Sequence, residues 1–431
     1  MKRKASSELG RWYASPDRKP LIIRGARQVG KTWLIQDFAS GRAAGSVYIN
    51  FEDDKQLRDI FEQDFNMERI LERISIQKDT DISSDTMIIL DEIQEAPHGI
   101  TALKYFAEKL PSQPVVAAGS LLGISMHQND SFPVGKVDFI DLYPMDFEEF
   151  LWATGHERFS KIISEKKWEL ITGVKDKLTH LLRLYYYVGG MPRAVSVYSS
   201  TKDLAAVRQI QLSLISSYDN DFSKHAPLSL VPRIRLVWNS VVSQLAKENK
   251  KFIYGLVREG ARAREYELAL EWLSDAGLLH KVCRTKKGEL PLKAYMDSSS
   301  FKVYLLDIGL LCALCELGPQ AVVDGSDILG AFKGGLTEQY VLQQLLSCKD
   351  TGIYYWSSDN SNGEIDFLLQ RSDTVIPIEV KAEENLKSKS LRLFSQKYNL
   401  YPALRFSMSD YREQDWMTNI PLYCLQVVST I

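Results

Sequence analysis

The chain of 431 residues has few cysteines, almost no net charge and no long apolar run. Five cysteines are too few for a disulfide scaffold and suit a reducing compartment. The formal net charge of −2 excludes a basic coat over the whole surface, so any contact with nucleic acid must be local. No window approaches the ~18 apolar residues of a membrane-spanning helix, and the N-terminus lacks an apolar signal core. We therefore expect a cytoplasmic protein without a membrane partner.

A glycine-rich turn lies between an apolar run and an amphipathic run near the N-terminus. Residues 25–32 read GARQVGKT, after the apolar residues 20–23 and before a helical pattern at 33–39. Strand, glycine-rich loop and helix form the context that the pattern G-x-x-x-x-G-K-[ST] requires. We predict a nucleotide-phosphate loop here, although a simple turn between a strand and a helix is the alternative. Its residues are Gly25, Ala26, Arg27, Gln28, Val29, Gly30, Lys31 and Thr32.

The residue types in this loop match the chemistry of phosphate binding. Gly25 and Gly30 let the backbone adopt positive φ and approach phosphates without a Cβ atom. The loop N–H groups and the positive end of the following helix would face the anion. Lys31 would reach the β- and γ-phosphates, and the Thr32 hydroxyl would bind Mg²⁺. ATP and Mg²⁺ are therefore the expected ligands.

Further apolar runs alternate with helical stretches. Strands are predicted at 46–51, 86–90 and 115–118, and helices at 59–76 and 100–110. This alternation predicts an α/β fold with a parallel sheet, whose ligands bind at the carboxyl ends of the strands.

Acidic and hydroxyl residues follow two of these strands directly. Asp91 is the expected Mg²⁺ partner, and Glu92 is expected to polarise the attacking water. A solvated acidic loop is the alternative for this pair. Ser120 would either sense the γ-phosphate or cap the next helix, and the sequence leaves both roles open.

The segments LIIRGARQVGKT at 21–32, LDEIQ at 90–94 and Gly119-Ser120 together resemble a large prokaryotic family of AAA-type ATP-binding proteins. Members of that family carry a C-terminal domain of unknown function. Residues 143–150 resemble the family's P-x-x-F-x-E-F segment, and residues 189–192 its G-G-x-P segment. The resemblance covers essentially the whole chain and implies an ATP-binding protein.

One position departs from that family. Its members usually have Gly-Arg before the P-x-x-F segment, where the arginine could act as a finger on a neighbour's ATP. This chain has Gly135 and Lys136 instead, and a lysine lacks the bidentate fork of arginine. Arg193, beside the G-G-x-P segment, is the other candidate for phosphate contact. A solvated surface charge is the alternative for both residues.

The middle of the chain divides into a helical stretch and a basic stretch. Residues 151–225 are predicted to form a helical lid and connector. Within 226–325, residues 226–300 hold 13 Lys and Arg against 8 Asp and Glu, a local net charge of +5. Helices at 234–245 and 261–274, followed by strands at 278–284 and 289–295, are the layout of a winged helix.

The basic stretch suggests DNA contact but also contains residues that oppose it. Arg262 and Arg264 would lie near the start of the recognition helix, and Lys286 and Lys287 on the wing. Phosphates would repel the acidic residues on the same helix, Glu265, Glu267 and Glu271. DNA or RNA binding and docking to a protein partner or a second copy both remain open.

The last module, at 326–431, contains a predicted hairpin with acidic residues on one face. If the loop is at 371–374, Gln370 pairs with Val375, and Asp366 lies directly opposite Glu379. Opposed carboxylates destabilise each other unless a cation lies between them. Lys381 follows on the same face, and a helix beginning near 334 carries Glu338. We expect Glu338, Asp366 and Glu379 to bind Mg²⁺ or Mn²⁺.

An acid on one strand and Glu-x-Lys on the next resemble the PD-(D/E)xK nuclease superfamily. The resemblance implies that the three acids hold the metal and that Lys381 assists the attacking water or the developing charge. A salt-bridged hairpin on a module without chemistry is the alternative. The predicted domains are therefore an ATPase domain at 1–150, the lid at 151–225, a winged helix at 226–325 and a nuclease-like domain at 326–431. In this hypothesis ATP turnover controls a module that is directed at nucleic acid, and the resemblance implies that this module is a nuclease. The alternative is a nucleotide-controlled switch whose C-terminal module is inactive and only binds nucleic acid or protein.

Overall fold

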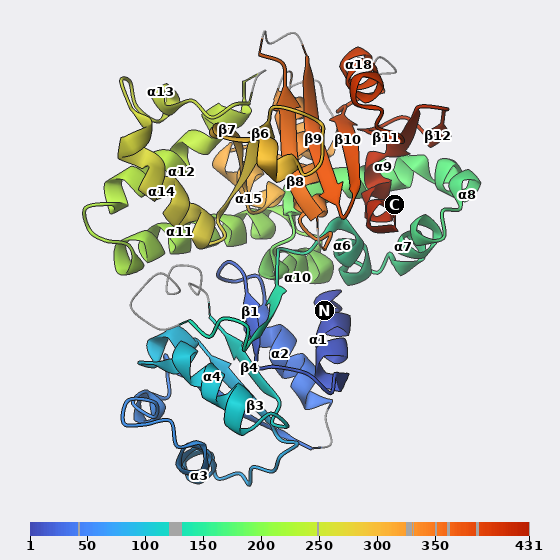
Figure 1. Cartoon of the computed structure of the whole chain (residues 1–431). Coiled ribbons are helices and arrows are strands. Elements are labelled where there is room, and N and C mark those ends of the chain that lie inside the picture. Colours follow the sequence, from blue (N-terminus) through green and yellow to red (C-terminus); the bar gives the residue numbers. More distant parts are fainter. Residues whose placement is uncertain are drawn as a thin grey trace. The chain divides into compact units, whose positions relative to one another are not determined.

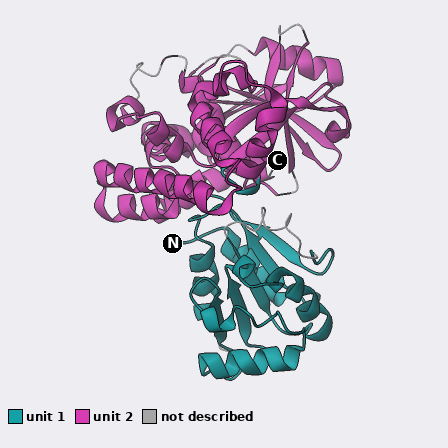
Figure 2. Cartoon of the chain, turned by 90° about the vertical axis from the view of Figure 1, so that its left-hand side faces the viewer, with its two compact units in different colours: residues 1–143, 275–278 teal, residues 144–274, 279–431 magenta. Residues whose placement is uncertain are grey.

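The computed structural model describes residues 1–41, 44–119, 132–247, 250–324, 330, 332–349, 351–359, 363–384 and 388–430. The chain divides into two compact units (Figure 2). The first comprises residues 1–143 and 275–278, and the second residues 144–274 and 279–431. No helix among the described residues is long and apolar enough to cross a membrane.

The first unit is an α/β layer structure around a parallel sheet (Figure 1). Its elements in chain order, with η for a 3₁₀ turn, are α1 (Ala5–Ala14), β1 (Leu21–Arg24), α2 (Lys31–Ser40), β2 (Ser46–Asn50), η1 (Lys55–Leu57), α3 (Met67–Lys78), β3 (Met87–Asp91), η2 (Ile93–Glu95), α4 (Gly99–Lys109), β4 (Val115–Ala118) and β5 (Asp138–Asp141).

The five strands are ordered β2-β3-β4-β1-β5, and every neighbouring pair is parallel. All of β3 and β4 is buried, as expected for strands covered on both faces. Side chains such as Ile88, Leu90 and Phe106 form the core between the sheet and the helices α3 and α4. The predicted parallel α/β fold is confirmed, and β5 is an additional strand that the sequence pattern did not indicate.

One predicted helix begins later than expected. The helix predicted at 59–76 begins at Met67, the first residue of α3. Asn66 caps this helix by accepting a hydrogen bond from the Arg69 N–H, and its own N–H donates to Asp64. These local side-chain bonds favour a turn before the helix, as is usual for Asp and Asn.

The second unit contains the remaining elements. They are α6 (Phe147–Ala153), α7 (Glu157–Ser164), α8 (Trp168–Gly173), α9 (Lys175–Val188), α10 (Pro192–Thr201), α11 (Leu204–His225), α12 (Val231–Leu245), α13 (Tyr254–Val257), α14 (Ala263–Asp275), β6 (Leu279–Thr285), η3 (Leu292–Tyr295), β7 (Met296–Leu305), α15 (Ile308–Leu314), α16 (Pro319–Val323), α17 (Phe332–Leu345), β8 (Thr351–Ser357), β9 (Glu364–Arg371), β10 (Thr374–Val380), α18 (Lys389–Tyr398), β11 (Ala403–Ser407), β12 (Arg412–Glu413), β13 (Met417–Pro421) and η5 (Leu422–Thr430).

Eight of these strands form one mixed sheet, ordered β12-β13-β11-β10-β9-β8-β6-β7 (Figure 1). Strand β6 pairs antiparallel with β7 and parallel with β8. Backbone hydrogen bonds therefore cross the boundary predicted at 325, and the β6–β7 hairpin is an integral part of the sheet. The strand expected at 289–295 is wrong: it is a turn ending in η3, where Pro291 has no N–H to donate to a ladder.

Helix α17 packs across this sheet against β7 and β10, and α18 contacts β9 and β10. Helix α12 contacts β7. The helices α12 and α14 precede the β6–β7 pair, but the second strand lies at Met296–Leu305 and both strands belong to the eight-stranded sheet. The winged-helix assignment itself stays a prediction.

Two segments that resemble the AAA-type family have structural roles in the second unit. Asp146 and Glu149 form a reciprocal capping box at the start of α6. The N–H of Gly190 donates to Asp307 at 2.6 Å, and a Cβ atom on Gly189, whose φ is +75°, would lie 2.2 Å from the same carboxylate. The G-G-x-P segment is therefore glycine-rich because the backbone touches a buried acid.

Candidate functional site

The glycine-rich loop has the backbone shape that close phosphate approach requires. Gly25 has φ of +148° and Gly30, the N-cap of α2, has φ of +95°. A Cβ atom on Gly25 would lie 2.1 Å from the Leu142 carbonyl oxygen, so no larger residue fits there. The loop thus passes directly from the end of β1 into the N-terminus of α2, where unpaired N–H groups attract anions.

Lys31 is buried at the start of α2, with 6% of its surface exposed. Its ammonium group donates to the carbonyl oxygens of Gly25 and Ala26, each at 2.8 Å. Burial lowers the pKa of Lys31 to about 8, against the opposing influence of the Glu92 and Asp91 charges. The lysine therefore rests on neutral loop carbonyls, and an anion such as a phosphate would provide a stronger partner.

Asp91, at the end of β3, accepts two hydroxyl hydrogen bonds on one carboxylate oxygen. Thr32 Oγ1 donates to its Oδ2 at 2.7 Å, and the Tyr48 hydroxyl of β2 donates to the same oxygen at 2.8 Å. Burial and this hydrogen bond raise the pKa of Tyr48, so Tyr48 remains a donor at neutral pH. Sequence reasoning missed Tyr48, although its place near the carboxyl end of the strand beside β3 was a usable signal.

Glu92 follows Asp91 in a left-handed backbone conformation, with φ of +49°. Its carboxylate accepts a hydrogen bond from the Gln94 side chain at 2.5 Å, and its N–H donates to Asp91 at 3.1 Å. Gln94 was also missed as a site residue. The D-E-I-Q segment is thus a turn that fixes the orientation of both acids, and backbone strain of this kind is frequent at functional sites.

The other loop residues support this arrangement. Ala26 and Val29 are buried, Gln28 has φ of +67°, and Arg27 lies 4.0 Å from Glu52. The side chain of Arg3 donates to the Val29 carbonyl at 2.9 Å and to the Tyr143 carbonyl at 2.7 Å. Arg3 holds the outer side of the loop, and nothing in its sequence position indicates this role.

Three other residues are candidates for phosphate contact. Ser120 lies outside the described residues. Lys136 forms an ion pair with Glu108 at 3.2 Å, and both side chains are partly exposed. Arg193 is exposed in the first turn of α10. Any role of these residues as a finger or sensor stays a prediction.

The donor set of this site fits a nucleotide with Mg²⁺. A hydroxyl oxygen from Thr32 and a carboxylate from Asp91 meet at 2.7 Å, and Mg²⁺ prefers such oxygen ligands. Lys31 supplies the positive charge beside them, and the loop has no room for side chains at Gly25. The arrangement can hold phosphates and place Glu92 next to them.

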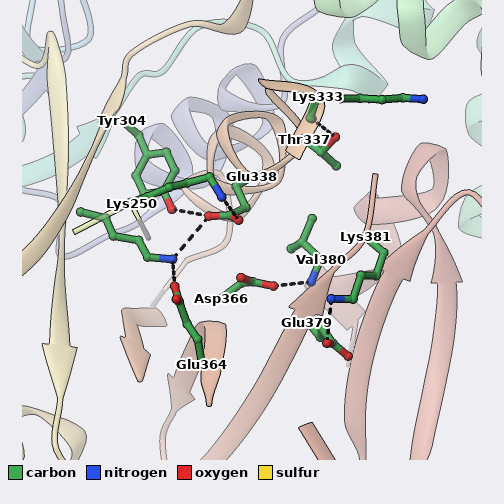
Figure 3. Close-up of polar contacts among 11 residues, drawn as sticks. Lys250, Tyr304, Lys333, Thr337, Glu338, Glu364, Asp366, Glu379, Val380 and Lys381 are labelled. Carbon is green, nitrogen blue, oxygen red and sulfur yellow. Dashed lines mark hydrogen bonds and ion pairs between the residues drawn. The ribbon is translucent and has the colours of Figure 1, made fainter. Parts of the chain in front are cut away.

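The predicted register of the C-terminal hairpin is confirmed. Val375 pairs with Gln370, and the ladder continues to Ile378 opposite Phe367. Asp366 and Glu379 come next along their strands, one position beyond the last pair of the ladder. There the ladder gives way to a side-chain bond, because Asp366 accepts the Val380 N–H at 2.7 Å (Figure 3).

Glu338, on α17, is held by two lysines and a tyrosine (Figure 3). Lys250 lies 2.7 Å and Lys302 3.4 Å from its carboxylate oxygens, and the Tyr304 hydroxyl donates at 3.1 Å. Burial favours the neutral acid, but the charges of Lys302 and Lys250 prevail and lower its pKa. Sequence reasoning missed both lysines, because they are distant in sequence from the hairpin.

Asp366 and Glu379 have different environments. Burial and the charge of Glu338 raise the pKa of Asp366 to about 7. Glu379 forms an ion pair with Lys381 at 3.0 Å through Oε1, whereas its buried Oε2 has no hydrogen-bond partner among the described residues. Within the described part of the chain, no group of three or more His, Cys, Asp or Glu is arranged to hold a metal ion. The four predicted residues are close together, but their carboxylates contact lysines and a backbone N–H.

The basic residues predicted to contact DNA lie at the surface. Arg262 and Arg264 are exposed near the start of α14, where the Arg262 N–H donates to Glu265 at 3.1 Å. Lys286 and Lys287 are exposed between β6 and η3, and Lys287 lies 3.5 Å from Glu289. Their exposure suits phosphate contact, which stays a prediction.

Three family models match successive parts of the chain. Residues 17–151 match a family described as AAA domain, so the chain contains a P-loop ATPase domain there. Residues 179–321 match Domain of unknown function (DUF8612), and residues 333–425 match Domain of unknown function (DUF4143). The resemblance to an AAA-type protein with C-terminal domains of unknown function is confirmed to this extent. A comparison with curated proteins finds no match.

Three solved structures with partial likeness are remote in sequence. The Walker-type ATPase paby2304 of Pyrococcus abyssi has 13% identity and a TM-score of 0.44, over 73% of this chain and 95% of its own. The Aeropyrum pernix Orc1 protein, solved with DNA, has 13% identity and a TM-score of 0.32, over 74% and 93%. Cdc6p from Pyrobaculum aerophilum has 13% identity and a TM-score of 0.26, over 75% and 96%. Likenesses this weak do not extend to function.

Proposed function

We propose that the chain is a Mg²⁺-dependent ATPase whose nucleotide state controls a C-terminal module directed at nucleic acid. One observation carries the ATPase half. Lys31, Thr32, Asp91 and Glu92 gather at the carboxyl ends of β1 and β3, each held by a named hydrogen bond or by the start of α2. This is where open parallel sheets bind their ligands.

Each residue then has a chemical task. Lys31 exchanges its loop carbonyls for the β- and γ-phosphate oxygens of ATP. Thr32 and Asp91 would hold Mg²⁺, which would neutralise phosphate charge when bound. Glu92 accepts a proton from the attacking water, and Gln94 keeps the Glu92 carboxylate in position.

Turnover by the isolated protein should be slow. An arginine finger is worth roughly 10³–10⁵ in rate. The lysine that replaces the expected finger, Lys136, has no fork and pairs with Glu108. A partner protein or a second copy of the chain would be needed to supply the missing charge.

A test of the ATPase half separates binding from chemistry. Lys31→Ala should abolish binding of a fluorescent ATP analogue, because the phosphates lose their buried cation. Glu92→Gln should bind the analogue as tightly as the natural chain and lose turnover by roughly 10²–10⁴-fold. Glu95→Gln removes an acid from the same turn and is the matched control. Full nucleotide affinity in Lys31→Ala would contradict the proposal.

The C-terminal module admits two functions, cleavage or binding alone. The Asp366, Glu379 and Lys381 arrangement on adjacent strands, with an unpartnered Glu379 oxygen, favours a metal-dependent nuclease. The lysines on Glu338 favour a module that binds nucleic acid or a protein without cleaving it. We favour binding, because these lysines already neutralise the acid that a metal would need.

Nicking of supercoiled plasmid in Mg²⁺ or Mn²⁺ distinguishes the two functions. Binding alone predicts no nicking at any ATP concentration, and retention of plasmid in a low-salt mobility assay. Nicking that disappears in both Asp366→Asn and Lys381→Ala would establish the nuclease instead. Glu383→Gln, an exposed acid two residues beyond Lys381, is the control.

A further inference from the structure

Two lysines from the basic stretch reach into the acidic cluster of the C-terminal module. Lys302, on β7, has 1% of its side chain exposed and contacts both Glu338 and Glu364. Lys250 contacts the second oxygen of Glu338. A backbone bridge between Lys251 and Lys302 fixes the segment that carries Lys250 beside β7. Both ammonium groups are therefore placed by the fold.

The charges of this cluster are almost balanced. Three lysines, at 250, 302 and 381, face the carboxylates of Glu338, Glu364, Asp366 and Glu379. Asp366 is the remaining acid, and its carboxylate accepts a backbone N–H. Lys250 and Lys302 together supply two positive charges next to Glu338, the same charge as one divalent cation.

We propose that the ammonium groups of Lys250 and Lys302 take the place of a divalent cation in this module. The module then assembles without metal and acts by binding a partner, which deepens the binding form of the proposed function. The lysines also tie the 226–325 stretch to α17 and β9, because Glu338 lies on α17 and Glu364 begins β9.

Displacement of these lysines by a metal ion is unfavourable for a physical reason. A cation at Glu338 would have to expel Lys302, whose side chain is enclosed by Tyr304, Tyr355 and the acids. A buried ammonium without an anionic partner is strongly destabilising. The lysines and a metal therefore compete for one site, and the fold favours the lysines.

Counting bound Mn²⁺ by electron paramagnetic resonance tests the proposal. The full chain carries Lys31→Ala, so that no metal enters with nucleotide. This protein should bind no Mn²⁺ that depends on Asp366. Adding Lys250→Met and Lys302→Met should create one Mn²⁺ site per chain, and adding Asp366→Asn should then remove it. Lys281→Met, which deletes a lysine packed on the Phe301 ring, is the matched control and should bind none.

Two results would overturn the proposal. One is an Mn²⁺ site in the Lys31→Ala chain that Asp366→Asn abolishes. The other is a folded double lysine variant that binds no Mn²⁺. If circular dichroism shows that the double variant is unfolded without metal, the same measurement with added Mn²⁺ decides: recovery of the folded spectrum supports the proposal and no recovery refutes it. None of these outcomes depends on ATP turnover, so failure here leaves the ATPase half intact.

Discussion

Two buried lysines in this chain have opposite electrostatic situations. Lys31 in the first unit donates hydrogen bonds to two neutral carbonyls of its loop, and burial lowers its pKa to about 8. Lys302 in the second unit is even less exposed, and burial alone would lower its pKa too. The charges of Glu338 and Glu364 instead raise the pKa of Lys302 well above its usual value.

We propose that Lys31 is placed to bind a ligand, whereas Lys302 stabilises the fold. A buried ammonium without an anion costs stability, and a phosphate would relieve that cost on binding. A buried ammonium between two carboxylates, as in Lys302, already has anionic partners and does not require a ligand. The lowered pKa of Lys31 therefore supports its proposed role in phosphate binding, because perturbed groups often cluster at functional sites.

The largest expected effect on stability concerns Lys302. Lys302→Met should lower the free energy of unfolding by about 3–5 kcal/mol, because Glu338 and Glu364 lose a buried partner. Urea denaturation of the full chain measures it. Lys281→Met, at an exposed site on β6, should stay within about 0.5 kcal/mol of the natural chain. Equal losses in the two variants would show that Lys302 matters no more to the fold than a surface lysine.

Lys31 should have the opposite effect on stability, because its buried charge lowers the free energy of unfolding. The pKa of Lys31 is about 8 in the folded protein, against an ordinary value of 10.5. Between these pH values the unfolded state therefore binds the proton and the folded state does not. Stability of the nucleotide-free protein should therefore rise from pH 8 to pH 10.5, and the buried charge costs on the order of 3 kcal/mol below pH 8. Lys31→Met loses two carbonyl hydrogen bonds, so its net gain at pH 7 should be about 1–3 kcal/mol.

Thermal unfolding across this pH range, without nucleotide, tests the sign. The Lys31→Met chain should lack the rise that the natural chain shows above pH 8. Destabilisation by Lys31→Met at pH 7 would mean that the loop carbonyls satisfy the ammonium fully.

A smaller effect is expected at Tyr48, which shares the Asp91 carboxylate with Thr32. Tyr48→Phe removes a hydrogen bond worth about 1 kcal/mol. The Mg²⁺ concentration that half-saturates binding of an ATP analogue should rise about fivefold, since 1.4 kcal/mol corresponds to tenfold. Tyr105→Phe, on α4, is the control. An unchanged Mg²⁺ requirement would show that Thr32 alone orients Asp91.

The smallest effect belongs to lysines at the surface. Lys286→Gln with Lys287→Gln should weaken binding to unrelated DNA sequences alike, by about threefold near 0.1 M salt, because phosphate contacts carry no base information. Mobility assays over a salt series would show a shallower salt dependence. If affinity is undetectable even at low salt, docking to a protein becomes the preferred role of this stretch.

The sequence predicted the first unit well because its signals are local. The loop at 25–32, the apolar β3 strand and the acids after it each lie within a few residues, and a parallel sheet brings strand ends together. The hairpin register was predictable for the same reason, because the turn between the two strands determines which residues pair.

Interactions between distant segments were not predictable. Arg3 on the loop, Tyr48 on Asp91 and Lys250 and Lys302 on Glu338 join residues from separate elements. Their residue types are ordinary for a solvated surface, so neither spacing nor composition distinguishes them. The ion pairs of Lys250 and Lys302 are the basis for our proposal that the acidic cluster holds ammonium groups in place of a metal ion.

The pairing of β6 with β8 has a practical consequence for dissecting the protein. A fragment that begins at 326 would lose β6 and β7, and β8 would become an edge strand with unpaired N–H and C=O groups. Such an edge invites pairing with other chains and aggregation. The same cut would strip Glu338 of Lys250 and Lys302. Fragments for expression should therefore keep residues 144–431 together, because residues 144–225 belong to the same compact unit.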